Sequence, residues 1–292
     1  MRIGFIGAGR VGFTMGKYMK LHGADVIGYY SRTQEHAREA ATFTDTRYFA
    51  DLDELINLCD AVILTVSDSA IMAVFEELCE RCKSKLNGKI LCHTSGATSS
   101  KVFENTSYQI YGYSIHPIYA ISDRYESYKH FSNAFITIDG NESKLDEITA
   151  LIQSVGLSYA VIDSASKSKY HAASVMASNM VCGLYGAAIR LMTECGFEEE
   201  AAAQALSGLF RDNAIGAAEN GPVMQLTGPL ERNDIATVRG HLGALNSEDA
   251  VLYKTAAAEV LKLAKVKNKE RDYSEMERLL KGDAYEEHKC NI

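Results

Sequence analysis

The chain has 292 residues, of which 47% are hydrophobic and 23% are charged, and its formal net charge at pH 7 is −8. This length suffices for two domains with sizeable cores. The acidic balance argues against a nucleic-acid-binding surface. Seven cysteines, an odd number without the spacing of a disulfide framework, favour a reducing cytoplasm. The chain opens directly on a predicted strand, so we expect no signal peptide, and no motif indicates a metal.

The strongest motif lies within the first thirty residues. Residues 2–6 form a short apolar run that predicts a buried strand, and residues 25–30 predict a second strand after a helical pattern. A G-x-G-x-x-G turn between the first strand and the helix is the fingerprint of dinucleotide binding. The alternative is a glycine-rich turn that binds nothing. The turn has the sequence Gly7-Ala8-Gly9-Arg10-Val11-Gly12.

Each glycine of this turn has a physical role in the fingerprint. Gly7 would permit the tight turn, Gly9 would let the backbone approach a pyrophosphate, and Gly12 would allow the helix to pack closely against the strand. The free N–H groups at the start of the helix would then face the phosphates, and we expect the whole turn to contact the cofactor.

The end of the second strand indicates which dinucleotide binds. An NAD site usually places Asp or Glu there to hold the ribose 2′-hydroxyl, whereas this chain has Ser31-Arg32-Thr33. A guanidinium flanked by two hydroxyls suits the 2′-phosphate of NADP, because Arg binds phosphate in a bidentate way. We therefore expect NADP as the cofactor. Two alternatives stay open: Arg32 could be a solvated surface residue, and Thr33 could mainly cap the following helix.

The next part of the chain alternates strands and helices, which predicts an α/β domain with a doubly wound, mostly parallel Rossmann sheet. Further strands are expected at residues 47–49, 61–66, 89–92, 109–113, 134–138 and 158–162. Ligands of such sheets lie beyond the carboxyl ends of the strands. Asp68 could instead cap its helix. The residues expected beside the cofactor at these ends are Val66, Ser67, Asp68, His93, Thr94, Ser95 and Gly96.

From residue 167 onward the pattern is helical. We predict a cofactor domain over residues 1–163 and an all-helical domain for substrate binding and dimerisation over residues 164–292. One long helix is expected from Lys167 to Cys195. It is rich in Ala, Gly and Ser, which favours close helix approach and a homodimer. Its uncharged stretch from Ala172 to Ile189 is interrupted by polar residues and glycines, so we expect it to be too polar for a membrane span. Further helices are expected at residues 198–216, 234–244, 247–265 and 274–280.

The long helix carries a polar stripe on an otherwise apolar surface. At about 100° per residue, one face collects polar residues. Buried polar groups must be paired, hydrated or functional, so this face is a candidate lining of the site. The alternative is a set of satisfied core hydroxyls with His171 bonded to a backbone carbonyl. The stripe consists of Lys167, His171, Ser174, Ser178 and Cys182, with Asn179 slightly to the side.

Two loops are also candidates. In the predicted loop Ser114-Ile115-His116-Pro117, Pro117 makes the preceding residue extended and so gives His116 a defined direction. Histidine is a natural proton donor near neutral pH, although this one could simply face water. The glycine-rich segment 221–234 could be a lid, a dimer contact or only a helix connection, and Asp234 is expected to cap the next helix.

Several motifs follow one another along the chain: His93-Thr94-Ser95-Gly96, Ser114-Ile115-His116-Pro117, Lys169-Tyr170-His171-Ala172-Ala173 with Ser178-Asn179, and Gly221-Pro222 through Leu226-Thr227-Gly228-Pro229, Arg232, Asp234, Thr237-Val238 and His241-Leu242. With them the chain resembles a bacterial family that pairs an NADP-binding Rossmann-like domain with a C-terminal helical domain of unassigned function. This family is similar in fold to pyrroline-5-carboxylate reductase, ketopantoate reductase and the 6-phosphogluconate dehydrogenase superfamily. The resemblance covers nearly the whole chain up to about Leu263.

The resemblance also bears on the catalytic residues. In the 3-hydroxyacid dehydrogenase relatives, the first interdomain helix carries a catalytic Lys, with Asn about one turn later. Lys167 and Lys169 lie near the matching start, but His171 stands one turn on and the nearest Asn is Asn179. The chain departs from the pattern at this point.

The expected function is an NADP-dependent oxidoreductase that moves a hydride to or from a small carbonyl or imine compound held between the two domains. His116 or His171 would donate the proton, and Ser95 with Lys167 or Lys169 would orient and polarise the acceptor. Clustered cations favour an anionic substrate. The alternatives are a non-catalytic NADP sensor and a reductase that passes electrons from NADPH to a deazaflavin.

Overall fold

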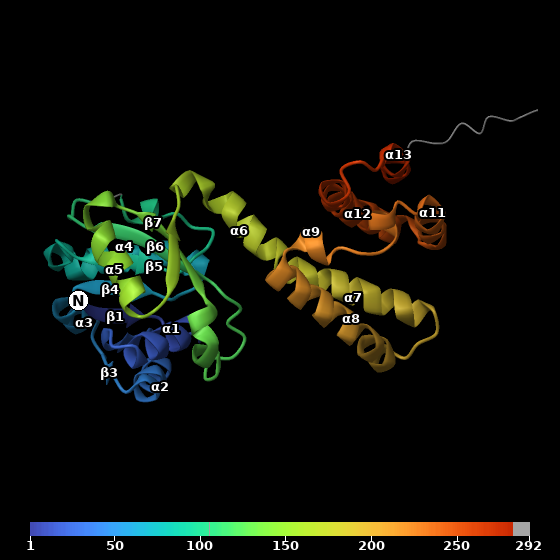
Figure 1. Cartoon of the computed structure of the whole chain (residues 1–292). Coiled ribbons are helices and arrows are strands. Elements are labelled where there is room, and N and C mark those ends of the chain that lie inside the picture. The colour runs from blue at the N-terminus through green and yellow to red at the C-terminus, as the bar shows by residue number, and fades with distance from the viewer. Residues whose placement is uncertain (105, 283–292) are drawn as a thin grey trace, which may run out of the picture. The chain divides into compact units, whose positions relative to one another are not determined.

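The computed structural model describes residues 1–104 and 106–282 (Figure 1). It divides into two compact units, one that ends at Cys182 and one that begins at Gly183. The predicted domain boundary after residue 163 marks the end of the sheet, whereas the compact units divide within the next helical stretch.

The first unit is built on one sheet whose described strands are β1 (Arg2–Ile6), β2 (Asp25–Tyr30), β3 (Arg47–Tyr48), β4 (Ala61–Leu64), β5 (Ile90–His93), β6 (Tyr111–Ile118), β7 (Phe135–Gly140) and β8 (Ser158–Val161). Their order is β3-β2-β1-β4-β5-β6-β7-β8. Only β6 and β7 pair antiparallel among the described strands. The strand order changes direction between β1 and β4, which is the switch point of a doubly wound sheet. The predicted Rossmann class is confirmed.

Helices cover both faces of this sheet. Alternate residues of a strand point to opposite faces, so β1 places Phe5 in one apolar cluster and Ile6 in another. Residues of α1, α2 and α5 join the cluster of Phe5, and residues of α3 and α4 join that of Ile6. The helices of this unit are α1 (Arg10–Leu21), α2 (Gln34–Thr44), α3 (Leu52–Leu58), α4 (Ile71–Cys82), α5 (Leu145–Ser154) and α6 (Lys167–Met176), and the short 3-10 turns are η1 (Asp68–Ala70), η2 (Lys83–Leu86), η3 (Ser100–Phe103), η4 (Ser127–Asn133), η5 (Glu142–Lys144) and η6 (Ser164–Ser166).

The segment Ser114–Pro117 lies within strand β6, so its prediction as a loop is wrong. In the ladder with β7, His116 is opposite Thr137 and Pro117 is opposite Ile136. On the other side, β5 ends opposite Ser114. A proline lacks the N–H that a central ladder needs, and it is tolerated here because β6 has run past its neighbour. The expectation that His116 has an extended backbone holds within the strand.

The expected long helix is interrupted. Helix α6 ends at Met176, and α7 (Asn179–Glu194) begins after a break of two residues. Two serine hydroxyls donate back to the preceding turn, from Ser174 to the oxygen of Tyr170 at 3.2 Å and from Ser178 to that of Ser174 at 2.7 Å. Such bonds compete with the helical ladder and bend helices, which accounts for the break at this point.

The helical stretch Ser164–Glu194 is long and apolar enough to cross a membrane, judged by length and composition alone. It is 31 residues long. A single helix of this kind is a weak indication, because helices that cover apolar cores in water-soluble proteins have the same composition.

The second unit is helical, as predicted. Its core gathers side chains from α11, α12 and α13, among them Val238, Leu261 and Met276. Asp234 caps α11 by accepting a hydrogen bond from the backbone N–H of Thr237 at 3.0 Å, as expected. The glycine–proline segment forms two short helices. The helices after α7 are α8 (Glu199–Asn220), α9 (Pro222–Gln225), α10 (Pro229–Arg232), α11 (Ile235–Ala244), α12 (Ser247–Lys267) and α13 (Ser274–Lys281).

Candidate active site

The glycine turn after β1 is held against the end of β4. Gly7 has a φ of 103°, a conformation that suits glycine. Its carbonyl oxygen accepts a hydrogen bond of 2.9 Å from the hydroxyl of Thr65. A Cβ on Gly12 would lie 2.6 Å from that hydroxyl, so only glycine lets α1 approach this closely. Around Gly9, by contrast, the nearest atom to such a Cβ is 4.0 Å away, which leaves open space beside the backbone.

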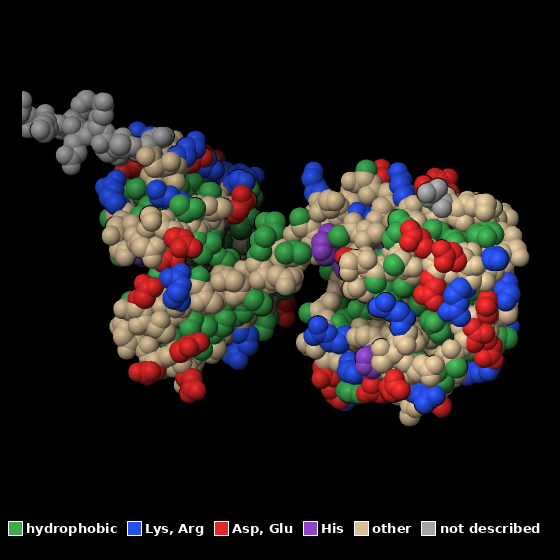
Figure 2. All heavy atoms as spheres, turned by 180° about the vertical axis from the view of Figure 1, so that it is seen from behind, with side chains coloured by type: hydrophobic (Ala, Val, Ile, Leu, Met, Phe, Trp, Pro, Cys, Tyr) green, Lys and Arg blue, Asp and Glu red, His purple; other side chains and the backbone are tan. Residues whose placement is uncertain are grey.

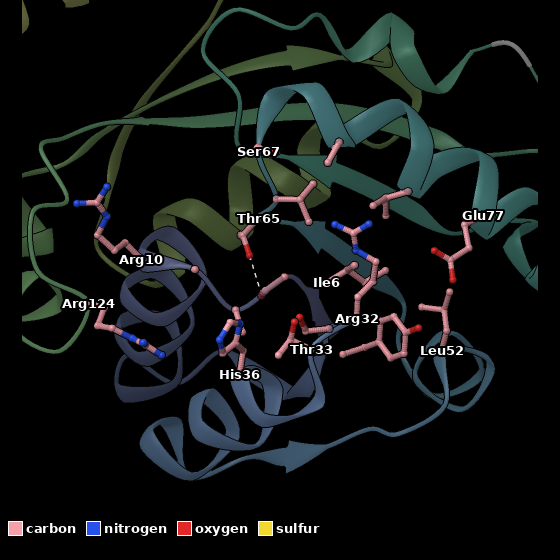
Figure 3. Close-up of a pocket in the computed structure, with 18 residues that line it drawn as sticks. Ile6, Arg10, Arg32, Thr33, His36, Leu52, Thr65, Ser67, Glu77 and Arg124 are labelled. Carbon is pink, nitrogen blue, oxygen red and sulfur yellow. Dashed lines mark hydrogen bonds between the residues drawn. The ribbon is translucent and has the colours of Figure 1, made fainter.

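A cavity of about 480 Å³ opens over this turn at the carboxyl ends of β1, β2 and β4 (Figure 3). It brings together most of the residues that the sequence assigned to the cofactor. Val11, Gly12 and Asp68 are not part of the lining, and neither are residues 93–96, which follow β5. The predicted residues that line the cavity are Gly7, Ala8, Gly9, Arg10, Ser31, Arg32, Thr33, Val66 and Ser67.

Among the charged side chains of the lining, the three arginines outnumber the one carboxylate, that of Glu77. Figure 3 shows Arg10 and Arg124 together at one end of the cavity, away from Arg32. Thr33 occupies the N-cap position of α2 but its side chain makes no capping hydrogen bond, so its hydroxyl is not committed to the helix. His36, in the first turn of α2, adds a titratable group. These groups and the open backbone at Gly9 fit a dinucleotide with several phosphates.

The sequence missed His36 and Arg124. His36 lies in the first turn of the helix that follows Arg32, and its place at the start of that helix was a usable signal. Arg124 comes from a distant loop, where its guanidinium lies 4.0 Å from the ring centre of Phe13 and 2.7 Å from a carboxylate oxygen of Glu39. No local pattern predicts that contact.

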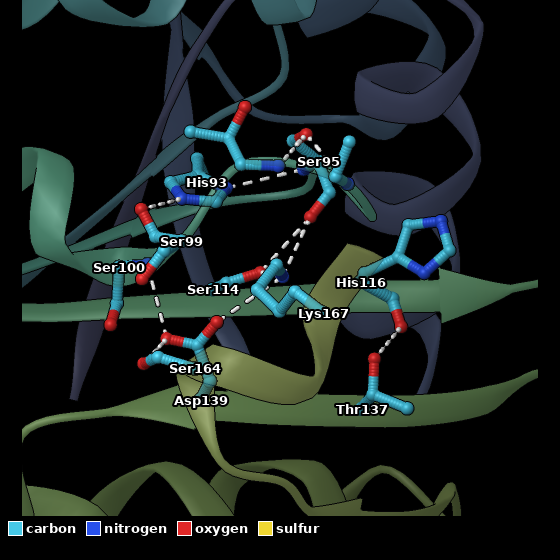
Figure 4. A network of polar contacts seen from close by, with 12 residues as sticks. His93, Ser95, Ser99, Ser100, Ser114, His116, Thr137, Asp139, Ser164 and Lys167 are labelled. Atoms are coloured by element: carbon cyan, nitrogen blue, oxygen red, sulfur yellow. Dashed lines mark hydrogen bonds and ion pairs between the residues drawn. The ribbon is translucent and has the colours of Figure 1, made fainter. Parts of the chain in front are cut away.

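A second group of polar residues is centred on a buried ammonium group (Figure 4). Lys167, the first residue of α6, is 2% exposed, and Asp139 of β7 is 1% exposed. The ammonium donates to the hydroxyl of Ser114 at 2.5 Å and to the backbone oxygen of Ser95 at 3.1 Å, and it lies 3.3 Å from Asp139 Oδ2. Burial lowers the pKa of Lys167. All three ammonium protons have protein oxygens nearby, so Lys167 ties α6 to the turn after β5, to the middle of β6 and to the end of β7.

The carboxylate of Asp139 has further partners. Its Oδ1 accepts from the backbone N–H of Ser100 at 3.0 Å and from the hydroxyl of Ser164 at 3.1 Å, while Oδ2 has only the ion pair. A buried ion pair needs such additional hydrogen bonds to offset desolvation. The cluster therefore fixes the start of α6 and, through it, the residues one turn later.

His93 locks the turn that follows β5. It is fully buried, its Nδ1 accepts from the backbone N–H of Ser95 at 3.2 Å, and its Nε2 lies 3.3 Å from the oxygen of Ser99. Burial is the main cause that lowers the pKa of His93 to about 4. The hydroxyl of Ser95 in turn accepts from the backbone N–H of Thr98 at 2.9 Å. These side chains shape the turn, and both ring nitrogens of His93 already have backbone partners.

Two histidines meet above Gly96 in the same turn. A Cβ on Gly96 would lie 2.5 Å from His171 Nδ1 and 2.9 Å from His116 Nε2, so glycine is required for the rings to lie against the backbone. The two ring centres are 5.8 Å apart. His116 Nδ1 is hydrogen-bonded to the hydroxyl of Tyr170, which also receives a hydrogen bond of 2.8 Å from Thr137. Burial is the main cause that lowers the pKa of His116 to about 4.

The remaining predicted catalytic residues are dispersed. Lys169 lies two residues after Lys167, on the opposite side of α6, and is exposed. Asn179 begins α7 and is exposed, and its Oδ1 lies 3.1 Å from the hydroxyl of Ser178, whose shorter hydrogen bond goes to the backbone oxygen of Ser174. The structure thus brings His116, His171 and the turn containing Ser95 together, and it leaves Lys169 and Asn179 outside that group.

Tyr170 is the residue of this group that the sequence missed. It is three residues after Lys167 and therefore on the same helical face. The rule that found His171 at four residues applied equally to Tyr170, so its signal was present in the sequence.

The fold and the two polar groups define a Rossmann-type dinucleotide-binding protein with titratable groups at the strand ends. Residues 2–95 match the family described as NADP oxidoreductase coenzyme F420-dependent. Residues 134–260 match a domain of unknown function, DUF2520. The chain thus has one segment that matches this NADP oxidoreductase family and, after it, a second segment that matches DUF2520. Comparison with curated proteins gives no match.

Solved structures show the same fold. A Bacteroides fragilis protein described as a candidate NADP oxidoreductase has a TM-score of 0.66 at 24% identity, over 89% of this chain and 98% of its own. A Thermotoga maritima protein has a TM-score of 0.66 at 23% identity, over 94% and 99%. The Plasmodium falciparum pyrroline carboxylate reductase with NADP bound has a TM-score of 0.59 at 15% identity, over 92% and 97%.

Proposed function

We propose that this protein is an NADP-dependent oxidoreductase acting on a small carbonyl or imine compound. The observation that carries the proposal is the cavity over the glycine turn, where Arg32 and Thr33 replace the carboxylate of an NAD site. NADP would supply or accept the hydride when bound. The relatives with known names, a pyrroline carboxylate reductase and imine reductases, support the choice of carbonyl or imine chemistry.

Different residues of the chain would bind the cofactor, donate to the acceptor and position the site. The backbone at Gly9 and the side chain of Arg10 would hold the pyrophosphate, and Arg32 with His36 would hold the 2′-phosphate. His116 faces Gly96 and would donate to the acceptor atom. Lys167 would act by positioning the Ser95 turn, because its protons already have partners. An anionic substrate stays a proposal, and its charge would be met by groups other than the paired Lys167.

The first experiment is a fluorescence titration of the full chain with NADPH and NADH in parallel. The wild type should bind NADPH at least about tenfold more tightly, because a charge-assisted bidentate contact is worth roughly 1.5–3 kcal/mol. Arg32→Ala should lose that preference. Arg38→Ala is the matched control: this arginine of α2 lies over the ring of Tyr48, outside the cavity, and its loss should change neither affinity.

Each other outcome contradicts part of the proposal. Equal binding of the two nucleotides would remove the 2′-phosphate argument and leave a dehydrogenase without a preference. If neither nucleotide binds, the oxidoreductase proposal fails and the glycine turn is only scaffold. Binding without turnover on carbonyl, imine and deazaflavin acceptors would instead favour the NADP sensor.

One alternative acceptor has specific support. The family described for residues 2–95 depends on coenzyme F420, a deazaflavin, so reduction of a deazaflavin by NADPH is a second candidate. A loss of deazaflavin absorbance upon mixing with NADPH and enzyme would favour it over small carbonyl and imine substrates. His116→Ala separates catalysis from binding, because a catalytic role predicts lost turnover with nucleotide affinity kept.

We also propose that the protein is a homodimer in the cytoplasm. Helix α7 has no buried residue among those described, although it is rich in apolar side chains such as Met180 and Leu184. Apolar side chains spread over the helical unit in Figure 2. An apolar hollow of about 280 Å³, lined by Leu184, Leu252 and neighbours, lies between α7 and α12. We propose that the same helical surface of a second copy of the chain covers these apolar side chains, as in a two-fold symmetric dimer. The proposed location in the cytoplasm rests on the cysteines. The six described cysteines are free thiols, which supports a reducing compartment.

A further inference from the structure

A directional chain of hydrogen bonds ends at His116. The hydroxyl of Thr137, in β7, has two acceptors within reach, the hydroxyl oxygen of Tyr170 at 2.8 Å and the backbone oxygen of His116 at 3.4 Å, and we assign its one proton to the shorter contact. A tyrosine hydroxyl has one proton, and with its oxygen accepting from Thr137 it can direct that proton to His116 Nδ1, its other partner. Thr137 is opposite His116 in the β6–β7 ladder, and Tyr170 comes from α6. Three separate elements therefore meet at one nitrogen.

This direction determines where the imidazole carries its proton. A neutral histidine has one N–H and one bare nitrogen, and the partner of one nitrogen selects the state of the other. If Nδ1 accepts from Tyr170, the proton must be on Nε2. That nitrogen lies against Gly96 and has no hydrogen bond to any described residue. The Nδ1 of His171 is buried and has no partner in the described part of the chain, whereas the Nε2 of His116 is not buried in this way and is open to a ligand.

The charges around the ring favour the neutral form. The ammonium of Lys167 and the ring of His171 lie on the α6 side, and His93 and Asp68 lie toward the ends of β5 and β4. Burial and Lys167 oppose a positive charge on His116, and the effect of Asp68 is smaller than either. A neutral ring keeps its Nε2–H as a hydrogen-bond donor across the neutral pH range.

We propose that Tyr170 and Thr137 are positioning residues that hold His116 as a neutral imidazole with its proton on Nε2, aimed at a hydrogen-bond acceptor of the ligand above Gly96. The ligand class is a carbonyl oxygen or an imine nitrogen, both of which accept one hydrogen bond. The proposal rests on the proposed function only for the identity of this acceptor. The tautomer itself is a property of the protein without any ligand.

The role differs from that of a protonated histidine. An imidazolium would be a charged acid that is lost as the pH rises through its pKa, whereas a neutral Nε2–H polarises the acceptor equally well at pH 6 and pH 8. The ion pair of Lys167 with Asp139 supports this arrangement, because it fixes the turn of α6 from which Tyr170 reaches His116.

The test is a two-dimensional long-range proton–nitrogen NMR spectrum of histidine side chains in the full chain, labelled with nitrogen-15 and free of nucleotide. His116→Gln identifies the His116 signals by their loss. At pH 7.5 the wild type should give the pattern of a neutral ring with a bare Nδ1 and a protonated Nε2. In Tyr170→Phe the Nδ1 resonance should move downfield, because that nitrogen loses its donor. Thr137→Val should give a smaller shift of the same sign.

Tyr159→Phe is the matched control. This tyrosine of the same sheet bonds only Gln153 at 3.3 Å among the described residues, and its loss should leave the His116 signals unchanged. A wild-type ring that is doubly protonated at pH 7.5, or that carries its proton on Nδ1, overturns the proposal without any variant. An Nδ1 resonance that Tyr170→Phe does not move also overturns it. Nucleotide titration can succeed while this test fails, so the two proposals are distinguished.

Discussion

The two units of this molecule differ in how they bury charge and apolar surface: both partners of an ion pair are buried in the sheet unit, whereas in the helical unit the buried Asp249 pairs with the half-exposed Arg190. The sheet unit buries an ion pair, Lys167 with Asp139, and a fully enclosed histidine, His93. The helical unit begins with a helix, α7, that buries none of its described residues, and Leu184 on it is 45% exposed. The sheet unit therefore pairs these buried polar groups within its own fold. The helical unit, in contrast, leaves apolar side chains of α7 exposed to water, which is unfavourable for a contiguous surface.

The difference has an energetic meaning. Burying charged groups costs several kcal/mol per ion unless partners offset the loss of water, and a domain keeps such groups where they fix a geometry. Exposed apolar side chains cost little individually, but contiguous ones favour association. Substitutions in the first unit should therefore act on folding and on the site, and those in the second should act on assembly.

The largest effect is expected at the ion pair. Asp139→Ala leaves the Lys167 ammonium buried without its counter-charge, and breaking a buried pair from one side costs about 3–5 kcal/mol in the free energy of unfolding. Urea denaturation followed by circular dichroism measures it. Lys169→Met is the matched control, because this exposed lysine of the same helix should change the free energy by less than about 0.5 kcal/mol.

A loss below about 1 kcal/mol in Asp139→Ala would contradict the buried, paired state of Lys167. The double variant Asp139→Leu with Lys167→Met should recover much of the loss, because two apolar groups leave no unpaired charge. That recovery would separate the cost of an orphaned charge from a general failure of packing.

The second effect is a pH dependence from His93. Its pKa is about 4 when folded and about 6.5 in an unfolded chain, so between these values only the unfolded state binds the proton. Stability is therefore lost as the pH falls from about 6.5 toward 4, by up to about 3 kcal/mol for this group. The free energy of unfolding at pH 7.5 and at pH 5 checks the sign.

His93→Gln should reduce this pH dependence, and His130→Gln, which removes an exposed histidine of η4, should leave it unchanged. The dependence should not vanish in His93→Gln, because the pKa of His116 is lowered in the same way. A stability that rises as the pH falls would show that His93 is stabilised in its protonated form, against the buried hydrogen bonds described here.

The parts that the sequence predicted well are local. Residues 2–30 contain a strand, a glycine turn, a helix and a strand in immediate succession, so each signal lies within a few residues of the structure that it specifies. Asp234 as the cap of α11 is another local signal. The eight-stranded sheet followed by helices also came from this alternation.

The errors involve distant partners. Pro117 suggested a loop, because a sequence does not reveal that β5 ends opposite Ser114 and leaves the edge of β6 free there. The ion pair of Lys167 could not be predicted for a similar reason, because nothing near this residue in the chain indicates that Asp139 of β7 lies 3.3 Å from its ammonium. Arg124 reaches the cofactor cavity from a loop for the same reason.

The third effect compares two glycines of one turn. Gly12→Ala places a Cβ 2.6 Å from the Thr65 hydroxyl and 2.9 Å from the oxygen of Gly7, so we expect a loss of about 1–3 kcal/mol in unfolding free energy from overpacking. Gly9→Ala meets no such atom, and its φ of −86° suits alanine. It should leave stability within about 0.5 kcal/mol and weaken NADPH binding. Thermal unfolding and nucleotide titration of both variants test the contrast, and normal NADPH affinity in Gly9→Ala would contradict a pyrophosphate at this backbone.

The smallest effect on folding and the clearest on assembly is expected from two exposed leucines. Leu21 at the end of α1 is 60% exposed and Leu184 of α7 is 45% exposed, so Leu→Glu at either should change the unfolding free energy of a single chain by about 0.5 kcal/mol or less. Leu184→Glu alone should shift a dimer to a monomer in light scattering at micromolar concentration, because a charge would be buried against the partner copy. A wild type that is already monomeric would refute the dimer, and recovery of the wild type in a detergent-solubilised membrane fraction would assign α6 and α7 to a bilayer. If Leu184→Glu leaves the dimer unchanged, the contact lies on another apolar surface. Leu184 would then be exposed in the dimer, as Leu21 of α1 is expected to be.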